Sequence, residues 1–309
     1  MRSHGELVLP SEVWNPTFSL FRDWVQPATE APEEYTFGTA LAVVGLAIGR
    51  DAYVQIGRRV YANEYVCLLG SAGLKKGTPF ALVHDEIVVP HIDDGLGMKV
   101  VRGTGSAEGL LEAFMEEVTE KDKNGKTQKI LKPVPERCVI TIEEELGYLL
   151  KKAHSDATAN LREMNCQLWD GVNIAPPTRS RSLRVERPFY SVLSMTTAET
   201  LEARLEEDDI LSGLLPRFIF FKGSMRPPLA WPQPPSEAGA KALAQALEGI
   251  RGHARRLRKS GKECLQPADS IRTAWEKVYT SLRRRAVEAP TPAIGRMLAR
   301  IDTHILKAA

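Results

Sequence analysis

A glycine-rich segment near the start of the chain is the stretch of this sequence best suited to bind an anion. It follows the apolar run Tyr65–Leu69, whose composition is that of a buried parallel strand. The segment 70–78 then supplies three glycines, two lysines and a threonine before a stretch that is compatible with a helix. Glycines let backbone N–H groups converge on an anion, a lysine meets the terminal phosphates, and a hydroxyl holds Mg²⁺. Strand, loop, lysine, hydroxyl and helix are the layout of a phosphate-binding P-loop.

The loop departs from the usual P-loop pattern at two positions. Lys75 stands where a glycine is expected, and Gly77 separates Lys76 from Thr78. An ordinary strand-to-helix turn with surface lysines is the alternative interpretation. In the P-loop interpretation Lys76 binds the β- and γ-phosphates of ATP and Thr78 binds Mg²⁺. The predicted nucleotide-binding residues are Gly70, Gly73, Lys75, Lys76, Gly77 and Thr78.

Three consecutive glutamates follow a second apolar run, residues 138–142. Carboxylates at the carboxyl end of a parallel strand lie where open α/β sheets place their ligands. Because side chains alternate along a strand, Glu143 and Glu145 are expected on one face and Glu144 on the other. We assign Glu143 to the metal shell and Glu145 to the attacking water, with Glu144 as the alternative for either role. A charged helix N-terminus is the competing interpretation of the segment.

Two further polar residues are associated with predicted strands. Thr196 follows the apolar run 190–195 and is assigned as a sensor of the γ-phosphate, with a helix-capping role for this polar run as the alternative. Arg217 opens the run 217–221 and is assigned to transition-state charge in a neighbouring subunit's site. A local ion pair of Arg217 with the acidic segment 206–209 is the alternative.

Length and composition set the frame for these residues. The 309 residues are 43% hydrophobic and 26% charged, which is typical of a globular chain with one large α/β domain and an appendage. The predicted fold is a three-layer α/β P-loop NTPase with a parallel sheet of the RecA/AAA+ type. The predicted divisions are an N-terminal arm (1–35), an ATPase core (36–226), and a C-terminal helical domain (236–309) after the proline-rich stretch 227–235. The last residues carry no helix-ending signal, so we expect that domain to continue beyond them.

A coarse reading of the chain places the other elements. Helices are expected at 37–50 and 155–171, and a short hairpin at 53–61. The stretch 82–100 is expected to be a helix end and a loop, and 236–309 to form three helices. A charged insert around Asn124-Gly125 predicts an exposed hairpin that carries Lys121, Lys123, Lys126 and Lys129.

Charge and cysteine content restrict the function classes. The net charge is only +2, but basic residues gather at 179–187, 251–262 and 283–285, which suits either nucleic acid or plain solubility. Four scattered cysteines show no metal-ligand spacing, so we expect reduced thiols. Apolar runs stay well under about 18 residues, and residues 1–10 lack a signal-peptide core, which predicts a cytoplasmic protein with no membrane partner.

With these motifs in order, the chain resembles a family of P-loop ATPases from phages, plasmids and bacterial mobile elements, often attached to primase domains as a helicase module. Lys-Lys-Gly-Thr at 75–78 looks like that family's variant P-loop, in which a basic residue precedes Lys-Gly-Thr. The segments 105–110 and 143–146 are similar to its Ser-x-Glu-Gly-Leu turn and its Glu-x-Glu-aromatic motif, with Leu146 in the aromatic position. Trp169-Asp170-Gly171 and Ser212-Gly213 with Arg217-Phe218 match two more signatures.

The resemblance implies ATP hydrolysis coupled to movement on, or remodelling of, single-stranded or forked DNA. It further implies ATP and Mg²⁺ as cofactors, a homo-oligomeric ring such as a hexamer, and a primase domain or subunit as partner in the bacterial cytoplasm or nucleoid. A catalytically weak P-loop scaffold that serves assembly or DNA binding is the alternative. A small-molecule kinase on the same fold would need a separate substrate pocket, and we find no residues for one in the sequence.

Overall fold

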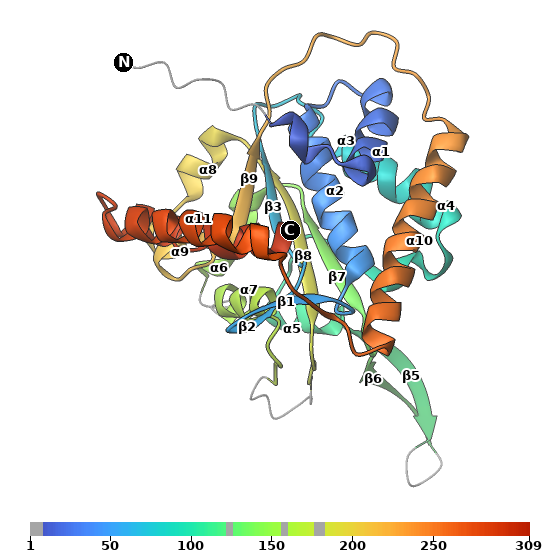
Figure 1. The fold of residues 1–309 in the computed structure, drawn as a ribbon. Coiled ribbons are helices and arrows are strands. Elements are labelled where there is room, and N and C mark those ends of the chain that lie inside the picture. The colour runs from blue at the N-terminus through green and yellow to red at the C-terminus, as the bar shows by residue number, and fades with distance from the viewer. Residues whose placement is uncertain (1–8, 122–125, 156–159, 176–182) are drawn as a thin grey trace.

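A five-stranded parallel sheet forms the centre of the protein, as seen in a computed structural model that describes residues 9–121, 126–155, 160–175 and 183–309 (Figure 1). The strand order is β4-β7-β8-β3-β9. The strands are β3 (Tyr65–Leu69), β4 (Met98–Arg102), β7 (Cys138–Glu143), β8 (Phe189–Thr196) and β9 (Phe218–Lys222). The chain is therefore an α/β protein, as the sequence predicts.

Helices cover both faces of the sheet, because alternate side chains of each strand point to opposite sides. Val66 and Leu68 of β3 pack into a core with the helices on one face, whereas Tyr65 and Cys67 pack into a second core on the other. The first face is covered by α1 (Pro16–Val25), α2 (Glu33–Ile48), α3 (Thr78–Val83) and α10 (Glu237–Lys259). The second is covered by α5 (Ala107–Glu112), α6 (Leu146–Ala153) and α7 (Asn160–Asp170).

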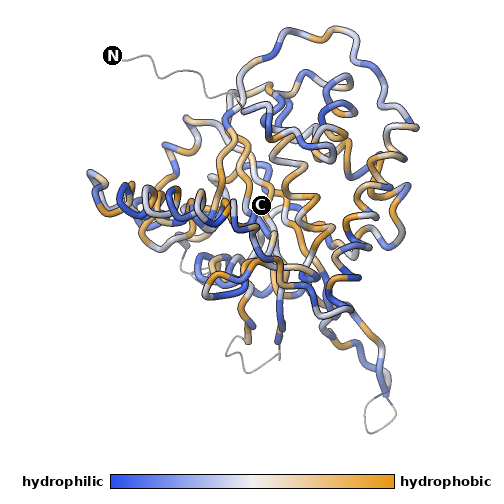
Figure 2. The backbone as a smooth tube through the Cα atoms, in the orientation of Figure 1, coloured by the Kyte–Doolittle hydropathy of each residue, from blue (hydrophilic) through white to orange (hydrophobic). Residues whose placement is uncertain are grey.

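Burial explains the strongly apolar composition of the central elements. All eight residues of β8 are buried, since β7 and β3 flank this strand and helices cover both of its faces. The helix α2 is apolar nearly all round and packs against β3, β8 and β9 as well as α1 and α10. Figure 2 shows these strands and α2 as predominantly hydrophobic segments at the centre of the molecule.

Two hairpins accompany the main sheet, and both agree with the sequence prediction. Strands β1 (Tyr53–Ile56) and β2 (Arg58–Val60) pair antiparallel, and β10 (Cys264–Leu265) adds to β1 in parallel. Strands β5 (Met115–Lys121) and β6 (Thr127–Pro133) form the hairpin that projects from the body in Figure 1. Lys129 pairs with Glu117 at 2.6 Å across it, and Lys132 pairs with Glu120, so the described part carries acids opposite its lysines. Lys123 and the predicted turn lie outside the described residues.

The expectation of a helix end and a loop over residues 82–100 was right for the helix end and wrong for the loop. After α3 the chain continues through a π-helical segment (His84–Val88), α4 (Val89–His91) and a 3₁₀ segment (Asp93–Gly97), and then forms the edge strand β4. β4 pairs only with β7 and is only partly buried, so its sequence lacks the continuous apolar run of the inner strands.

The remaining segments are short helices near the sheet ends and the C-terminal helices. They are 3₁₀ segments at Ser11–Val13, Gln26–Ala28 and Leu215–Arg217, with α8 (Ala198–Arg204), α9 (Glu207–Leu211), α11 (Asp269–Val287), α12 (Pro292–Leu298) and α13 (Ile301–Ala308). The third helix expected in the C-terminal region is thus split into α12 and α13. Within the described ranges, every helix is too short or too polar to cross a bilayer.

The division into arm, core and C-terminal domain stays a prediction, and the packing shows how these parts meet. Phe21 and Trp24 of α1 are buried in the same core as Leu243 and Leu247 of α10. At the other end of the chain, His304 and Lys307 of α13 are buried against the segment that precedes β3.

Candidate functional site

The predicted P-loop joins β3 to α3 at the carboxyl edge of the sheet. β3 ends at Leu69, and the N–H of Gly70 donates to the carbonyl of Thr196 at 3.2 Å, which ties the start of the loop to the neighbouring strand β8. Thr78 is the first residue of α3, and its N–H donates to the carbonyl of Lys75 at 3.0 Å. The loop therefore approaches a helix N-terminus, where backbone N–H groups and the helix dipole favour anions.

Two loop residues adopt the left-handed backbone conformation. Gly73 has φ +86°, and Lys75 has φ +53°. A lysine at the usual glycine position therefore takes the conformation that glycine adopts without strain. The sequence departs from the pattern here while the backbone still makes the expected turn.

Lys76 folds back over the loop. Its Nζ donates to the carbonyls of Gly70 and Ser71, each at 2.9 Å. Partial burial lowers the pKa of Lys76, and the nearby charge of Glu145 opposes that shift. Carbonyl groups thus hold the ammonium at the mouth of the loop. When a phosphate binds, its oxygens would take the place of these carbonyls as partners of the ammonium.

A surface hollow of about 390 Å³ adjoins the loop and the first turns of the following helix. Its lining includes Lys75, Lys76 and Thr78 of the loop, with Asp85 and Glu86 from the helical segment that follows. The two acids were not singled out in the sequence, where they occur in a stretch read as a helix end. They limit how much negative charge this part of the hollow accepts.

Glu145 and Thr196 meet beside the P-loop. The Thr196 hydroxyl donates to Oε1 of Glu145 at 2.5 Å, and the same oxygen accepts the N–H of Gly147 at 3.0 Å. Thr196 is buried and lies opposite Leu69 in the ladder, one residue before the loop begins. The sequence assigned a γ-phosphate sensor and a water-orienting carboxylate to these residues, and the fold places the two side chains in contact.

Glu145 lies at the start of α6 and not within β7. Its side chain caps that helix through the N–H of Gly147, so the expected strand alternation between Glu143 and Glu145 ends at the strand boundary. The catalytic interpretation and the helix-N-terminus interpretation of the glutamate segment each describe part of the structure. Glu145 caps α6 and also lies beside the P-loop.

Glu143 and Glu144 are placed differently. Glu143 is buried at the end of β7, where Oε1 accepts the N–H of Thr104 at 2.5 Å. Burial raises the pKa of Glu143, and the hydrogen bonds from Thr104 oppose the shift. Glu144 is exposed to solvent. Glu143 thus connects β7 to the loop after β4, and its assignment to the metal shell stays a prediction.

The fit of Mg²⁺ depends on Thr78. Among the described residues no three His, Cys, Asp or Glu side chains gather as a metal site. Thr78 is partly exposed at the start of α3 and offers a hydroxyl ligand of the kind that P-loops use. The Thr78 hydroxyl therefore fits a Mg²⁺ ion whose other ligands would be phosphate oxygens and water molecules.

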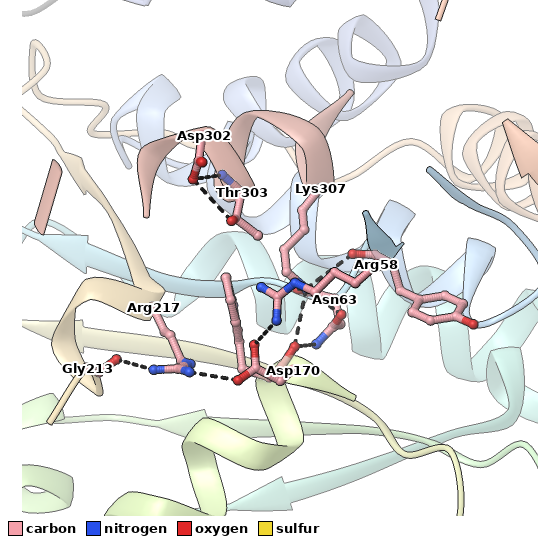
Figure 3. A network of polar contacts seen from close by, with 10 residues as sticks. Arg58, Asn63, Asp170, Gly213, Arg217, Asp302, Thr303 and Lys307 are labelled. Carbon is pink, nitrogen blue, oxygen red and sulfur yellow. Dashed lines mark hydrogen bonds and ion pairs between the residues drawn. The ribbon is translucent and has the colours of Figure 1, made fainter. Parts of the chain in front are cut away.

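Arg217 belongs to a different network of polar contacts, which includes Asp170 and Gly213 (Figure 3). It precedes β9, so it is at the amino edge of the parallel sheet, opposite the P-loop edge. The guanidinium is buried and donates to Asp170 Oδ2 and to the carbonyl of Gly213, each at 2.7 Å. This placement favours a role within its own chain, because the guanidinium is enclosed there, and the assignment to a neighbour's active site stays a prediction. An ion pair was the alternative, but the partner is Asp170 and not the segment 206–209.

Two residues near the loop escaped the sequence analysis. The Tyr35 hydroxyl donates to the carbonyl of Leu69 at 2.9 Å, and burial raises the pKa of this phenol to about 12. A side chain at Gly70 would collide with that hydroxyl, which explains the glycine there. Lys222 pairs with Leu69 in the ladder and is exposed at the same edge. Neither belongs to a local motif, and only the pairing of distant strands brings them to the loop.

Comparison with known proteins adds little to this geometry. No protein-family model matches the chain, and no curated protein matches it. Among solved structures, the chain is similar to a putative ATPase from Cytophaga hutchinsonii, with 12% identity and a TM-score of 0.39 over 88% of this chain and 69% of that one. At that level the likeness carries no argument, so a function has to rest on the site itself.

Proposed function

We propose that the protein binds ATP at the loop 70–78 and hydrolyses it. The observation that carries the proposal is the contact between Glu145 and Thr196 directly beside Lys76 and the loop. A lysine, a carboxylate and a hydroxyl at the carboxyl edge of a parallel sheet, next to a glycine-containing loop and a helix N-terminus, are the groups that phosphoryl transfer to water requires.

Each residue has a role that follows from its position. Lys76 exchanges its two carbonyl partners for the oxygens of the β- and γ-phosphates, and Thr78 supplies a hydroxyl to Mg²⁺, which neutralises phosphate charge. Glu145 orients a water molecule with the carboxylate oxygen that Thr196 and Gly147 leave unused. Thr196, at the end of β8 and paired with Leu69 of β3, couples the position of the γ-phosphate to that carboxylate through its hydrogen bond.

Within this class we propose the RecA/AAA+ type. Support comes from the strand order, in which β8 with Thr196 is inserted between the P-loop strand β3 and the glutamate-bearing strand β7. The insertion separates lysine and glutamate by one strand, which leaves room for a water molecule between the phosphate and the carboxylate.

The coupling of hydrolysis to DNA is a further proposal. We infer a motor or remodeller on single-stranded or forked DNA, working as a homo-oligomeric ring in a phage or mobile-element replication system with a primase partner. Its support is the ordered set of motifs that resembles such a family and the uneven distribution of basic residues. Arg217 is not part of this proposal, so a ring would need another residue to act between subunits.

A nucleotide-binding scaffold with weak catalysis is the second candidate, and one observation favours it. The ammonium of Lys76 already has hydrogen-bond partners in the loop's own carbonyls, and Lys75 replaces the usual glycine. The loop is therefore stable without a bound phosphate, which a scaffold with weak catalysis would share.

Phosphate release with and without single-stranded DNA, measured beside nucleotide binding, separates the candidates. The ATPase proposal expects turnover that Lys76→Ala and Glu145→Gln both abolish, with binding lost only in the first. Tight binding by the wild-type protein without turnover supports the scaffold, and failure to bind ATP at all rejects both.

A further inference from the structure

A second hollow, of about 380 Å³, lies at the edge of the sheet opposite the P-loop. Its walls come from the segments that lead into β7 and β8 and from the ends of α2 and α10. Among the described residues, five arginines line it: Arg50, Arg137, Arg184, Arg187 and Arg258. The same part of the chain contributes two carboxylates to the lining, Glu136 and Glu186, so the described lining carries an excess of positive charge.

The inner arginines are held in place by the body of the protein. Arg50 donates to the carbonyls of Pro188 at 2.8 Å and Gly171 at 3.3 Å, and its guanidinium stacks 3.9 Å above the ring centre of Tyr61. Arg137 donates to the carbonyl of Met115 at 2.7 Å. These contacts orient two guanidinium groups with neutral partners, so both charges stay available to a ligand.

Arg50 and Arg187 form the least compensated part of the hollow. Burial lowers the pKa of Arg50, and the neighbouring charge of Arg187 lowers it further. Within the described ranges neither guanidinium is paired with a carboxylate, and the buried Nε of Arg50 has no hydrogen-bond partner. The charge of Glu136 acts on Arg187 from a distance, but among the described residues neither arginine forms an ion pair. Two like charges held near one another in this way favour the entry of an anion between them.

The mouth of the hollow is open to solvent. Arg184 and Arg187 are exposed, and Arg184 pairs with Glu186 at 3.0 Å in a surface ion pair of little energetic value. Apolar groups of Phe114, Val134 and Val185 form part of the wall, which lowers the local dielectric and strengthens charge interactions inside. The β5–β6 hairpin, which projects from the body in Figure 1, begins at this hollow, since Phe114 and Pro133 at its base belong to the lining.

We propose that this arginine-lined hollow binds a phosphate group. A phosphate offers several oxygens to two or more guanidinium forks at once, which suits Arg50 and Arg187 on adjacent walls. A ligand with a single carboxylate would bind less well, because Glu136 and Glu186 of the chain already supply carboxylates at the mouth of the hollow. The phosphate belongs either to the backbone of a nucleic-acid strand or to a free anion, and the two sources share the same recognition chemistry.

The proposal does not depend on ATP binding at the loop. The walls of the hollow precede β7 and β8, whereas the loop follows β3, so the two sites lie at opposite ends of parallel strands. Binding is therefore measured in the Lys76→Ala protein as well as in the wild-type chain. The same result in both separates this site from the P-loop.

The test uses Arg184→Gln/Arg187→Gln, which removes two exposed charges and keeps most of each side-chain stem. Arg284→Gln on the exposed face of α11 is the matched control, since it also removes an arginine charge, at a residue outside the lining. Probes are inorganic pyrophosphate, by calorimetry, and a fluorescein-labelled single-stranded oligonucleotide, by anisotropy, each at low and moderate salt. Circular dichroism melting verifies that all variants fold.

We expect the double variant to bind its probe at least about tenfold more weakly, as the loss of charged hydrogen bonds implies, and the control to bind like the parent. If the double variant binds both probes more weakly, the site is assigned to the phosphates of a nucleic-acid strand. If it binds only pyrophosphate more weakly, the site is assigned to a free anion. Either result supports a phosphate site. Equal weakening by Arg284→Gln, failure of the parent to bind either probe, or stronger binding of a poly-glutamate peptide overturns it.

Discussion

Oε1 of Glu145 accepts two hydrogen bonds, one from the hydroxyl of Thr196 and one from the backbone of Gly147. The first comes from a buried strand and the second from the helix that Glu145 caps. The carboxylate is therefore oriented by two rigid elements, with its second oxygen left for other partners. This arrangement is what a water-orienting group needs, because a fixed acceptor loses little freedom when the transition state forms.

Glu145→Gln should stop turnover and leave nucleotide binding intact. The amide oxygen of glutamine still accepts from Thr196 and Gly147, so the fold and the loop are preserved while the negative charge is lost. We expect phosphate release to fall by about a hundredfold or more. Retained ATP, measured by filter binding or stopped-flow, checks the prediction; wild-type turnover in this variant would remove Glu145 from the mechanism.

Thr196→Val tests the positioning of that carboxylate by a second residue. Valine keeps the shape of the buried side chain and removes the hydrogen bond to Glu145. We predict an approximately tenfold lower kcat with a nearly unchanged KM for ATP, because the hydroxyl acts on geometry in the transition state. Thr196→Ser should restore most of the rate. An equal loss in both variants would mean that packing, and not the hydroxyl, matters at this position.

The two lysines of the loop should behave differently. Lys76→Ala should abolish ATP binding, since in the proposed complex its ammonium leaves the carbonyls of Gly70 and Ser71 for phosphate oxygens, and Lys75→Ala should weaken binding only modestly. Lys75 has a positive φ, so Lys75→Gly should raise the free energy of unfolding by about 0.5–1 kcal/mol. Isothermal titration and chemical denaturation test both statements, and a more damaging Lys75→Ala would show that our register for the loop is wrong.

Substitution of Arg217 should affect the stability of the fold more directly than ATP hydrolysis. Removing it leaves Arg58 as the ion-pair partner of Asp170 among the described residues, at a partly buried position, and we expect Arg217→Ala to lower the free energy of unfolding by about 3 kcal/mol. Burial raises the pKa of Asp170, but the ion pairs with Arg217 and Arg58 outweigh it and hold the pKa low. Mixing Arg217→Ala with Lys76→Ala should restore no ATPase activity; recovery of activity would return Arg217 to a shared site.

Lys307 should make stability depend on pH. Full burial lowers the pKa of this lysine from 10.5 to about 7. Between those values the unfolded chain holds the proton that the folded chain has released, so the free energy of unfolding rises with pH across the window. From pH 7 to pH 9 we expect the wild-type protein to gain about 2 kcal/mol relative to Lys307→Met. Denaturant titrations of both proteins at several pH values measure this difference, and parallel curves would contradict it.

The sequence alone predicts the inner part of the fold better than its margins. β3, β7 and β8 are apolar runs bounded by turns, and α2 is apolar on all sides, so local composition identifies them. β4 escaped prediction because an edge strand with one partner needs no continuous apolar run. The last helix is split into α12 and α13, which pack against α9 and β2 respectively, and no local signal in the sequence predicts these contacts.

For the candidate site, too, local sequence predicts some residues, whereas the contacts between distant segments could not be predicted. The loop, Glu145 and Thr196 could be found in the sequence because each lies at the end of a recognisable strand. Strand order and register decided that Thr196 contacts Glu145 and that Arg217 lies at the far edge, and neither follows from spacing. Arg50 and Arg187 lie more than a hundred residues apart in the sequence, so their hollow becomes visible only once the chain is folded.

β8 joins the two edges of the protein through a single segment of chain. It begins at Phe189, directly after Pro188 in the wall of the arginine-lined hollow, and ends at Thr196 beside the P-loop, a span of about 26 Å for eight extended residues. The strand is buried along its whole length and bonded on both sides, so it cannot slide or lengthen without breaking its ladders to β3 and β7. Occupancy of one edge should therefore leave the affinity of the other unchanged, and the two ligands should bind as thermodynamically independent events.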